Sequence, residues 1–315
     1  MSRPITLGID LGGTGIKFGL VDYQGRLLRT RKISTPSKGD PRRVIDLIVT
    51  ETRSLLGSLQ SKKIKGIGVG TAGDVDPATG SVRISPNLNW HNVPLKRLLR
   101  RRLNYPITVE NDANAAAWAA YVVEAKRQVA NLLCVTVGTG VGGGLIIDGK
   151  LYRGTSGSAA EIGHLTLYPE GLPCPCGNQG CLERYVGARA MIQEAQRAIQ
   201  AGKSSLIARL VQNDLSKITP LILQEAARRH DKLALQLWNQ VGERLGIGLA
   251  SLINVFNPEW IVLAGGLSRA GSLLVDPVRR TIMKRSFPSA AAAAKLIISK
   301  LNQDLGIVGA GLIAH

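Results

Sequence analysis

The chain has 315 residues, of which 44% are hydrophobic, and a formal net charge of +18. At roughly 150 residues per domain, this length predicts two domains rather than one. No apolar run reaches the roughly 18 residues that a membrane span needs, and a strand pattern begins almost at once, at Ile5, which leaves no room for a signal peptide. We therefore expect a cytoplasmic protein without a membrane partner.

The excess of basic residues is spread along the chain, which favours a solvated surface over a single binding patch. The one dense cluster is residues 96–102, and it leaves open a groove for a polyanion such as polyphosphate.

The first half of the chain alternates strand and helix patterns. Short apolar runs separated by glycine turns predict strands, and a longer run with helical periodicity predicts a helix. The expected strands are 5–10, 16–22, 26–33, 64–69 and 107–109, and the expected helices are 42–59, 95–103 and 113–123.

A near-repeat follows in the second half. The same interval of 126 positions separates Gly12 from Gly138 and Asp22 from Asp148, with a strand, a glycine turn and a strand in each copy. This pattern predicts an internal duplication that forms two similar α/β lobes. The remaining residues predict helices at 189–201, 221–229 and 233–255, and a strand at 260–264.

Three glycine turns each follow an apolar strand and are candidates for phosphate binding. Glycine lets backbone N–H groups approach phosphate oxygens closely, and threonine hydroxyls add further donors. None of the three has the spacing of a dinucleotide fingerprint or of a P-loop. The candidate phosphate-binding residues are Gly12, Gly13, Thr14, Gly138, Thr139, Gly140, Gly265 and Gly266.

Three of the four cysteines fall within eight positions, and a histidine lies ten positions before the first of them. Soft thiolates together with one imidazole select Zn²⁺, and four protein ligands leave no open position for catalysis. We therefore expect one structural zinc bound by His164, Cys174, Cys176 and Cys181. Cys134 lies in an apolar run and is expected in the core.

These motifs resemble those of the ROK family of sugar kinases and repressors, within the actin, hexokinase and heat-shock-70 superfamily. The resemblance covers nearly the whole chain, and the most specific part is the segment 161–183, which includes the cysteines. Its other motifs are residues 10–14, 70–73, 110–114 and 138–144. The resemblance implies a two-lobed actin-like (ribonuclease H-like) fold with a cleft for sugar and nucleotide between the lobes.

By this resemblance, Asp112 is the general base that takes the proton from the attacking sugar hydroxyl. Its position at the start of an expected helix also fits a helix N-cap, and both roles can hold together. The resemblance further implies that Asn111 orients the sugar and that Asp10 lies near Mg²⁺ and the transferred phosphoryl group, although Asp10 also fits a residue that closes the turn.

The resemblance likewise implies that Glu161 and Glu183 bind sugar hydroxyls, and that His164 contacts the sugar while it binds zinc. The full set of expected substrate-binding residues is Gly73, Asn87, Asn111, Asp112, Glu161, His164 and Glu183. One departure from many relatives is Tyr185-Val186-Gly187, where they end in Ser-Gly, a change that could reshape one wall of the expected sugar pocket.

We expect an N-terminal lobe at 1–115, a C-terminal lobe at 116–302 with the zinc loop 161–183, and a C-terminal tail, about 303–315, that packs back on the first lobe. The expected activity is phosphorylation of the 6-hydroxyl of glucose by Mg-ATP, in a homodimer or homotetramer without specific nucleic-acid binding. The alternatives are an N-acetylmannosamine or N-acetylglucosamine kinase, a mannokinase, a glucokinase that uses polyphosphate, and a sugar-sensing regulator without catalysis. A repressor would need a DNA-binding domain, for which nine residues before Asp10 leave no room.

Overall fold

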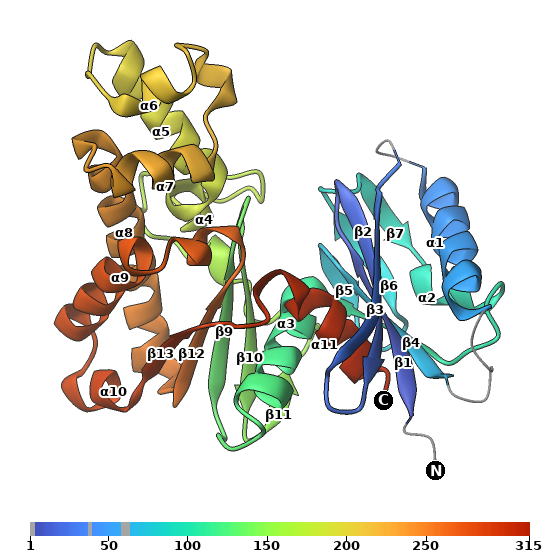
Figure 1. Cartoon of the computed structure of the whole chain (residues 1–315). Helices are drawn as coiled ribbons and strands as arrows, with labels where there is room; N and C mark the ends of the chain where they lie inside the picture. Colours follow the sequence, from blue (N-terminus) through green and yellow to red (C-terminus); the bar gives the residue numbers. More distant parts are fainter. Residues whose placement is uncertain (1–3, 37–39, 58–63) are drawn as a thin grey trace. The chain divides into compact units, whose positions relative to one another are not determined.

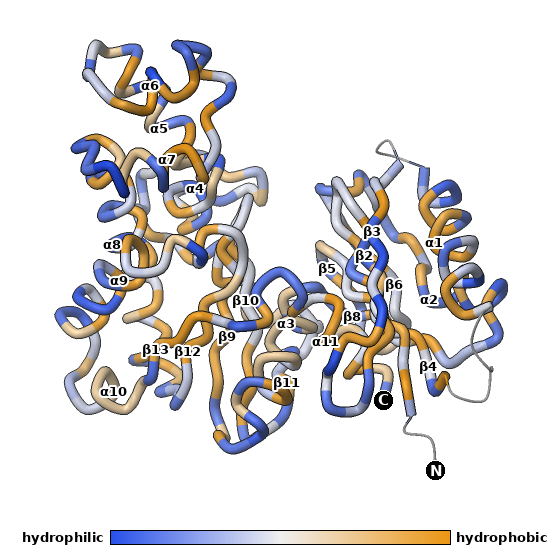
Figure 2. The backbone as a smooth tube through the Cα atoms, viewed as in Figure 1, coloured by the Kyte–Doolittle hydropathy of each residue, from blue (hydrophilic) through white to orange (hydrophobic). Residues whose placement is uncertain are grey.

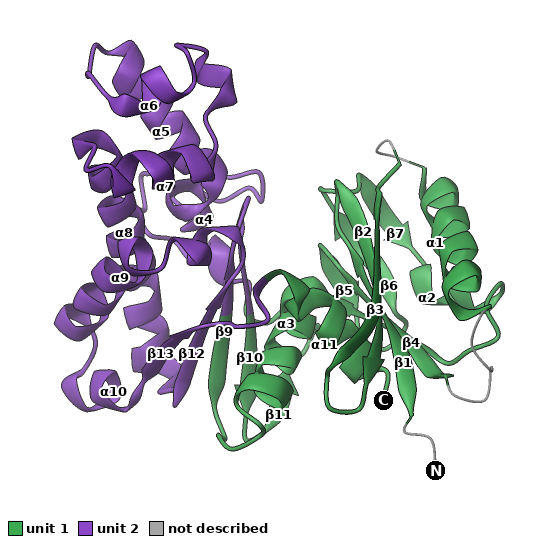
Figure 3. Cartoon of the chain, viewed as in Figure 1, with its two compact units in different colours: residues 1–134, 144–160, 303–315 green, residues 135–143, 161–302 purple. Residues whose placement is uncertain are grey.

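A computed structural model describes residues 4–36, 40–57 and 64–315 of the chain (Figure 1). The chain forms two compact units (Figure 3). Unit 1 comprises residues 1–134, 144–160 and 303–315, and unit 2 comprises residues 135–143 and 161–302. The lobe boundary expected near residue 115 concerns the two sides of a substrate cleft, and it stays a prediction.

Unit 1 is built around a five-stranded sheet with the order β3-β2-β1-β4-β8. The first three strands are antiparallel, and β4 and β8 run parallel to β1. The strands are β1 (Ile5–Leu11), β2 (Gly15–Asp22), β3 (Leu27–Ser34), β4 (Ile64–Thr71) and β8 (Ile107–Asn111).

The helix α11 (Leu305–Ile313) packs against β1, β2 and β4 of this sheet, although it lies at the other end of the chain. Glycines allow this close approach, because a Cβ atom at Gly8 would overlap the backbone oxygen of Ile307 and one at Gly68 would overlap that of Ala310. The C-terminal segment 303–315 thus belongs to unit 1.

The remaining helices and strands of unit 1 help to bury an apolar core that includes Trp90, Phe18 and Leu7. Figure 2 shows both hydrophobic and hydrophilic residues along α1, as expected for a helix with one buried face. These elements are α1 (Pro41–Leu56), α2 (Leu95–Arg100), α3 (Asp112–Ala119), the π-helical turn Ala120–Glu124, and a small sheet of β5 (Asp74–Asp76), β6 (Ser81–Ser85) and β7 (Trp90–Val93).

A second five-stranded sheet has the order β11-β10-β9-β12-β13. In chain order, this arrangement matches that of the first sheet strand for strand, so the duplication predicted from the interval of 126 positions is present in the topology. Its strands are β9 (Leu132–Val137), β10 (Val141–Ile147), β11 (Lys150–Tyr152), β12 (Trp260–Ala264) and β13 (Lys295–Ile298).

Outside these strands, unit 2 is mostly helical, and its longest helix is α8 (Lys232–Phe256). The Asp231 side chain caps α8 by accepting from the Ala234 N–H, and Asn257 ends the helix in the left-handed conformation. The other helices are α4 (Glu183–Val186), α5 (Ala188–Gln200), α6 (Leu206–Leu210), α7 (Pro220–Arg228), α9 (Ser272–Arg285) and α10 (Pro288–Ala293). Within the described parts of the chain, no helix is both long and apolar enough to cross a membrane.

Most expected elements occur within one to three residues of their predicted bounds. The helix expected over 42–59 ends at Leu56, and positions 58 and 59 lie outside the described residues. The sequence reasoning missed β5, β6, β7, β11 and β13, which have three to five residues each. It also missed α9 and gave no structure to α11, whose apolar sequence has no polar face to mark a helical period.

Candidate functional site

The predicted site residues fall into two groups, one in each unit. In unit 1 they lie where parallel strands end, because Leu11, Thr71 and Asn111 are neighbours in register at the carboxyl ends of β1, β4 and β8. The turn 12–14 and Gly73 follow β1 and β4, and Asp112 follows β8 directly as the first residue of α3. The carboxyl edge of a parallel sheet is where α/β proteins commonly bind ligands.

Asp10 lies one residue before the end of β1 and is largely buried, with 21% of its side chain exposed. Burial raises the pKa of this carboxyl above its usual value, and the Lys17 ammonium partly offsets that effect. The Lys17 Nζ lies 3.3 Å from Asp10 Oδ2 and donates to the Gln303 backbone oxygen at 2.9 Å. Asp10 therefore offers one hard oxygen donor of the kind that Mg²⁺ prefers, beside a lysine that competes for it.

The turn after β1 packs directly against Asn87. A Cβ atom at Gly13 would lie 2.7 Å from the Asn87 backbone oxygen, so only glycine fits there without displacing its neighbour. The Thr35 hydroxyl donates to the Gly12 oxygen at 2.7 Å and closes the turn from the other side. The structure thus brings a predicted phosphate-binding turn and a predicted sugar-binding residue together in unit 1.

The start of α3 differs in detail from the expectation. Asn111, rather than Asp112, is the N-cap: its Oδ1 accepts from the N–H groups of Ala113 and Asn114 at 2.9 and 3.0 Å. Its Nδ2 donates to the Gly73 oxygen at 3.0 Å, so most of its hydrogen-bonding capacity is used within the protein. Asp112 is the first residue of the helix, and its Oδ1 accepts from the Ala113 N–H at 2.9 Å.

Glu110 precedes this motif and is buried, with 5% of its side chain exposed. Its Oε2 accepts from Arg153 Nε at 2.6 Å, and its Oε1 accepts from the Asn111 N–H and from Asn114 Nδ2 at 3.0 and 3.1 Å. Sequence reasoning did not single out Arg153, because nothing local to it indicates a partner 43 positions away.

In unit 2, the four predicted zinc ligands come together. The ligand atoms of His164, Cys174, Cys176 and Cys181 all lie within 4.8 Å of one another. His164 Nδ1 lies 3.7 Å from the Cys174 sulfur, and the sulfurs of Cys176 and Cys181 are also 3.7 Å apart.

These separations fit a tetrahedral zinc site. With Zn–S bonds of about 2.3 Å, the edge of a tetrahedron is roughly 3.8 Å, close to both observed distances. Burial raises the pKa of the Cys181 thiol to about 12, whereas a backbone hydrogen bond from Asn178 lowers the pKa of the Cys176 thiol. A metal that binds Cys181 must therefore displace its proton.

Tyr185, in the segment that departs from many relatives, supports this cysteine-containing loop. Its ring packs edge-on against Tyr168 with the centroids 4.8 Å apart, and its hydroxyl oxygen accepts from the Leu172 N–H at 2.6 Å. The departure therefore contributes to the packing of the loop.

Glu183 connects the cysteine segment to the second glycine turn, residues 138–140. Its Oε2 accepts from the Val141 N–H at 2.9 Å, and a Cβ atom at Gly140 would overlap the same oxygen. Glu161 is exposed and begins the short 3₁₀ turn Ile162–His164. The sugar-binding roles expected for Glu161, His164 and Glu183 stay predictions.

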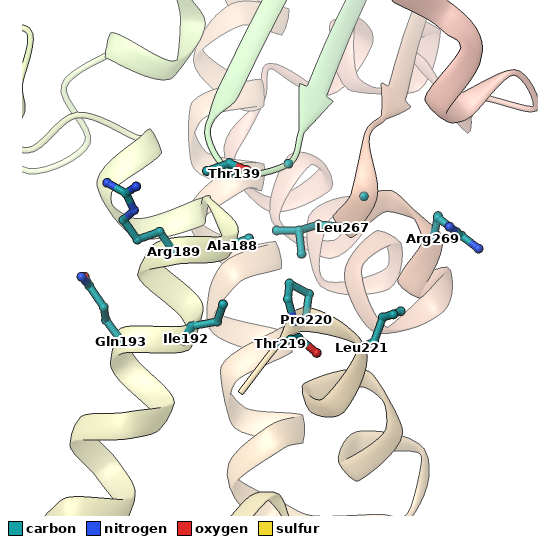
Figure 4. A pocket seen from close by; sticks show the side chains of 12 residues that line it. Thr139, Ala188, Arg189, Ile192, Gln193, Thr219, Pro220, Leu221, Leu267 and Arg269 are labelled. Atoms are coloured by element: carbon teal, nitrogen blue, oxygen red, sulfur yellow. The ribbon is translucent and has the colours of Figure 1, made fainter. Parts of the chain in front are cut away.

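A pocket of about 740 Å³ lies beside the second glycine turn (Figure 4). Figure 4 shows Thr139 on one side of it and Thr219, Pro220 and Leu221 on the other, with Leu267 between them. Its lining residues are Gly138, Thr139, Ala188, Arg189, Ile192, Gln193, Thr219, Pro220, Leu221, Gly266, Leu267 and Arg269.

This pocket contains Gly138, Thr139 and Gly266 from the predicted phosphate-binding set, whereas Gly140 and Gly265 are not part of its lining. Sequence reasoning missed its walls from α5 and α7. The Thr219-Pro220 pair marks the start of a helix and could have drawn attention to α7, since Thr219 caps it and Pro220 is its first residue. Nothing in the sequence indicates that this helix end faces a pocket.

The two matching sheets and the glycine turns between their first strands define the class: a protein with the actin-like fold of sugar kinases. A solved structure of a ROK family glucokinase from Streptomyces griseus, in complex with glucose and AMPPNP, has a TM-score of 0.87 to this chain at 35% identity, and covers 98% of both chains.

The ROK family model matches residues 6–315, and the chain belongs to the ROK family. A glucokinase of Streptomyces coelicolor is 36% identical over 315 residues, which cover 99% of this chain and 98% of the relative. A xylose repressor of Caldicellulosiruptor bescii is 33% identical, over 96% of this chain and 76% of the repressor. The full-length matches to glucokinases support a sugar kinase.

Proposed function

We propose that the chain is an ATP-dependent glucokinase that transfers the γ-phosphoryl group of ATP to the 6-hydroxyl of glucose. The observation that carries the proposal is the position of Asp112, the first residue of α3 at the carboxyl end of β8, next to the cap Asn111. Similarity over the whole chain to glucokinases supports the choice of reaction.

In this reaction, Asp112 accepts the proton of the glucose 6-hydroxyl as the hydroxyl oxygen forms its bond to the γ-phosphorus. The bond between that phosphorus and the bridging oxygen breaks, and ADP leaves with the electron pair. The positive end of α3 favours the carboxylate form of Asp112, and the bond from the Ala113 N–H fixes one of its oxygens.

We assign the pocket of unit 2 to the nucleotide. Its apolar residues Ile192, Pro220 and Leu267 suit a purine base, while Gly138 and Thr139 present the second glycine turn to the phosphates. Asp10 and the turn 12–14 of unit 1 would serve the transferred phosphoryl group, with Mg²⁺ neutralising its charge when bound. This division of roles supports ATP over polyphosphate, which has no base and needs no apolar pocket.

For the sugar, we propose the predicted set Gly73, Asn87, Asn111, Asp112, Glu161, His164 and Glu183. Carboxylates that accept hydrogen bonds from sugar hydroxyl groups form short, charge-assisted bonds, and they can distinguish glucose from N-acetylated sugars. Zn²⁺ bound by the cysteine cluster would hold Glu183 and His164 in place without activating water. A cytoplasmic location and a homodimer or homotetramer remain our predictions.

A second candidate is a sugar-sensing regulator, which the match to the xylose repressor favours. Such a protein would bind sugar without phosphorylating it. The presence of Asp10, Asp112 and the nucleotide-sized pocket supports the kinase instead.

The substitution Asp112→Asn tests the proposal. Loss of a positioned general base lowers kcat by roughly 10²–10⁴-fold, whereas the amide can still form hydrogen bonds, so glucose affinity changes little. A coupled assay measures kcat, and equilibrium titration measures glucose binding. Asp46→Asn, on the exposed face of α1, is the matched control. A variant with more than about a tenth of the wild-type kcat would contradict the role of Asp112.

A further inference from the structure

Arg153 directly follows β11, far from Asp112 in sequence, yet it contacts the motif that contains Asp112. Its Nε donates to Glu110 Oε2 at 2.6 Å, in an ion pair whose glutamate side chain is 5% exposed and whose arginine side chain is 35% exposed. None of the roles proposed above uses this pair.

The other oxygen of Glu110 forms hydrogen bonds with two residues at the start of α3. Glu110 Oε1 accepts from the Asn111 N–H and from Asn114 Nδ2, and Asn111 in turn caps the helix through the N–H groups of Ala113 and Asn114. In sequence, Asp112 therefore lies between Asn111 and Asn114, and the positions of both depend on the Glu110 carboxylate.

A buried carboxylate is stable in one position only if its charge is compensated and its oxygens are hydrogen-bonded. Within the part of the chain that the structure describes, Arg153 is the cation that forms an ion pair with Glu110. Without it, Glu110 would gain by turning toward water, and its bonds to Asn111 and Asn114 would be lost.

The segment around Arg153 is itself bonded to other residues of unit 1. Arg83 donates to the Ser156 backbone oxygen at 2.8 Å, and the Ser158 hydroxyl donates to Asp74 Oδ1 at 2.8 Å. The arginine is thus presented from a segment that is tied at several points.

We propose that Arg153 is a positioning residue for phosphoryl transfer, which acts on Asp112 through the Glu110 carboxylate. The inference rests on the proposed role of Asp112 as the base. Arg153 aligns the carboxylate of Asp112 with the sugar hydroxyl and does not itself contact the substrate in this account.

The test is Arg153→Gln, measured in the wild-type and in the Asp112→Asn backgrounds. A misplacement of about 1 Å in a reacting group can cost on the order of 10²-fold in rate, so we expect kcat to fall by roughly 10- to 100-fold in the wild-type background. The KM for ATP should stay within about twofold, because the residues that line the pocket belong to unit 2. In the Asp112→Asn background, Arg153→Gln should cause almost no further loss, because the residue through which it acts is already disabled.

Two further variants separate positioning from general stability. The double variant Arg153→Gln with Glu110→Gln removes the uncompensated charge while the amide oxygen can still accept from Asn111 and Asn114, so it should recover part of the lost kcat and fold even if the single variant does not. Arg31→Gln is the matched control, because it removes the arginine from an ion pair of similar length, 2.8 Å to a Glu51 side chain that is 12% exposed, in unit 1. It should lower stability and leave kcat near the wild-type value.

Wild-type kcat in Arg153→Gln would overturn the inference, as would an equal loss of kcat in both backgrounds. Failure of the proposed function would look different: Asp112→Asn alone would retain high activity, whatever Arg153→Gln does.

Discussion

The two glycine turns of the duplicated units occupy equivalent places, yet they differ in charge. The first turn, at residues 12–14, follows Asp10, whose side chain forms an ion pair with Lys17 on the opposite strand of the hairpin. The interval of 126 positions places Thr136 and Gly143 at the corresponding positions of the second hairpin, so the second turn has neither charge from its own strands.

The second turn instead receives a carboxylate from elsewhere and borders a pocket. Glu183 accepts from the Val141 N–H just after the turn, and Gly138 and Thr139 line the pocket with the apolar residues of α5 and α7. The two turns therefore occupy equivalent places in the duplicated units, but the first has a charged pair on its own strands and the second borders a binding pocket. On our proposal, the first serves the transferred phosphoryl group and the second holds the nucleotide.

The largest effect should come from removing a ligand of the proposed zinc site, because this segment also carries Glu183, which bonds next to the second turn. Cys176→Ser removes one proposed zinc ligand, and structural zinc contributes on the order of 10 kcal/mol of apparent binding energy to its local fold. We expect elemental analysis to give about one zinc per chain for the wild type and much less for the variant, with a lower melting temperature. Cys134→Ala, which changes the cysteine outside the cluster, should keep its zinc. A fully active, zinc-free protein after exhaustive chelation would rule the site out.

The second-largest effect should be on kcat, and it should come from removing the carboxylate of the first hairpin. Asp10→Asn removes the carboxylate beside the first turn, and loss of one electrostatic group at a reacting centre costs on the order of 10²-fold in kcat. The same measurement on Thr136→Val, at the equivalent position of the second hairpin, should give a kcat within about twofold of the wild type. Equal effects of the two substitutions would mean that the hairpins do not divide the work as proposed.

The smallest effect concerns the packing of the second turn. Gly140→Ala places a methyl group against the Glu183 carboxylate and should lower stability by roughly 1–3 kcal/mol and raise the KM for ATP. Gly138→Ala meets no atom within 4 Å, so its melting temperature should match that of the wild type. Thermal unfolding of both variants checks this contrast, which fails if Gly138→Ala is the more destabilised of the two.

The sequence was sufficient to predict the duplicated fold, because the glycine turns and apolar strands repeat at one interval. It also predicted that His164, Cys174, Cys176 and Cys181 come together, because their spacing and ligand chemistry fit a metal site; the zinc itself stays a prediction. The ROK resemblance added the candidate roles of Asp112 and Asp10, which composition and spacing alone do not determine.

What the sequence could not supply depends on contacts between distant segments. The pairing of Arg153 with Glu110, the bond from Asn111 to the Gly73 oxygen and the bond from Val141 to Glu183 each join residues whose local patterns allow several partners. The walls of the pocket likewise come from α5 and α7, whose apolar residues would look the same in an ordinary core. Such features follow from the packing of the whole unit.

The central claim, a glucokinase that uses ATP, is tested most directly by kcat/KM for a panel of hexoses. The panel should contain glucose, mannose, N-acetylmannosamine and N-acetylglucosamine, each with MgATP and with polyphosphate at the same near-physiological salt, since salt screens the attraction of a basic surface for a polyanion. We predict the highest kcat/KM for glucose with MgATP. A higher value for an N-acetylated sugar or for polyphosphate, or no phosphorylation of any hexose, would contradict the claim.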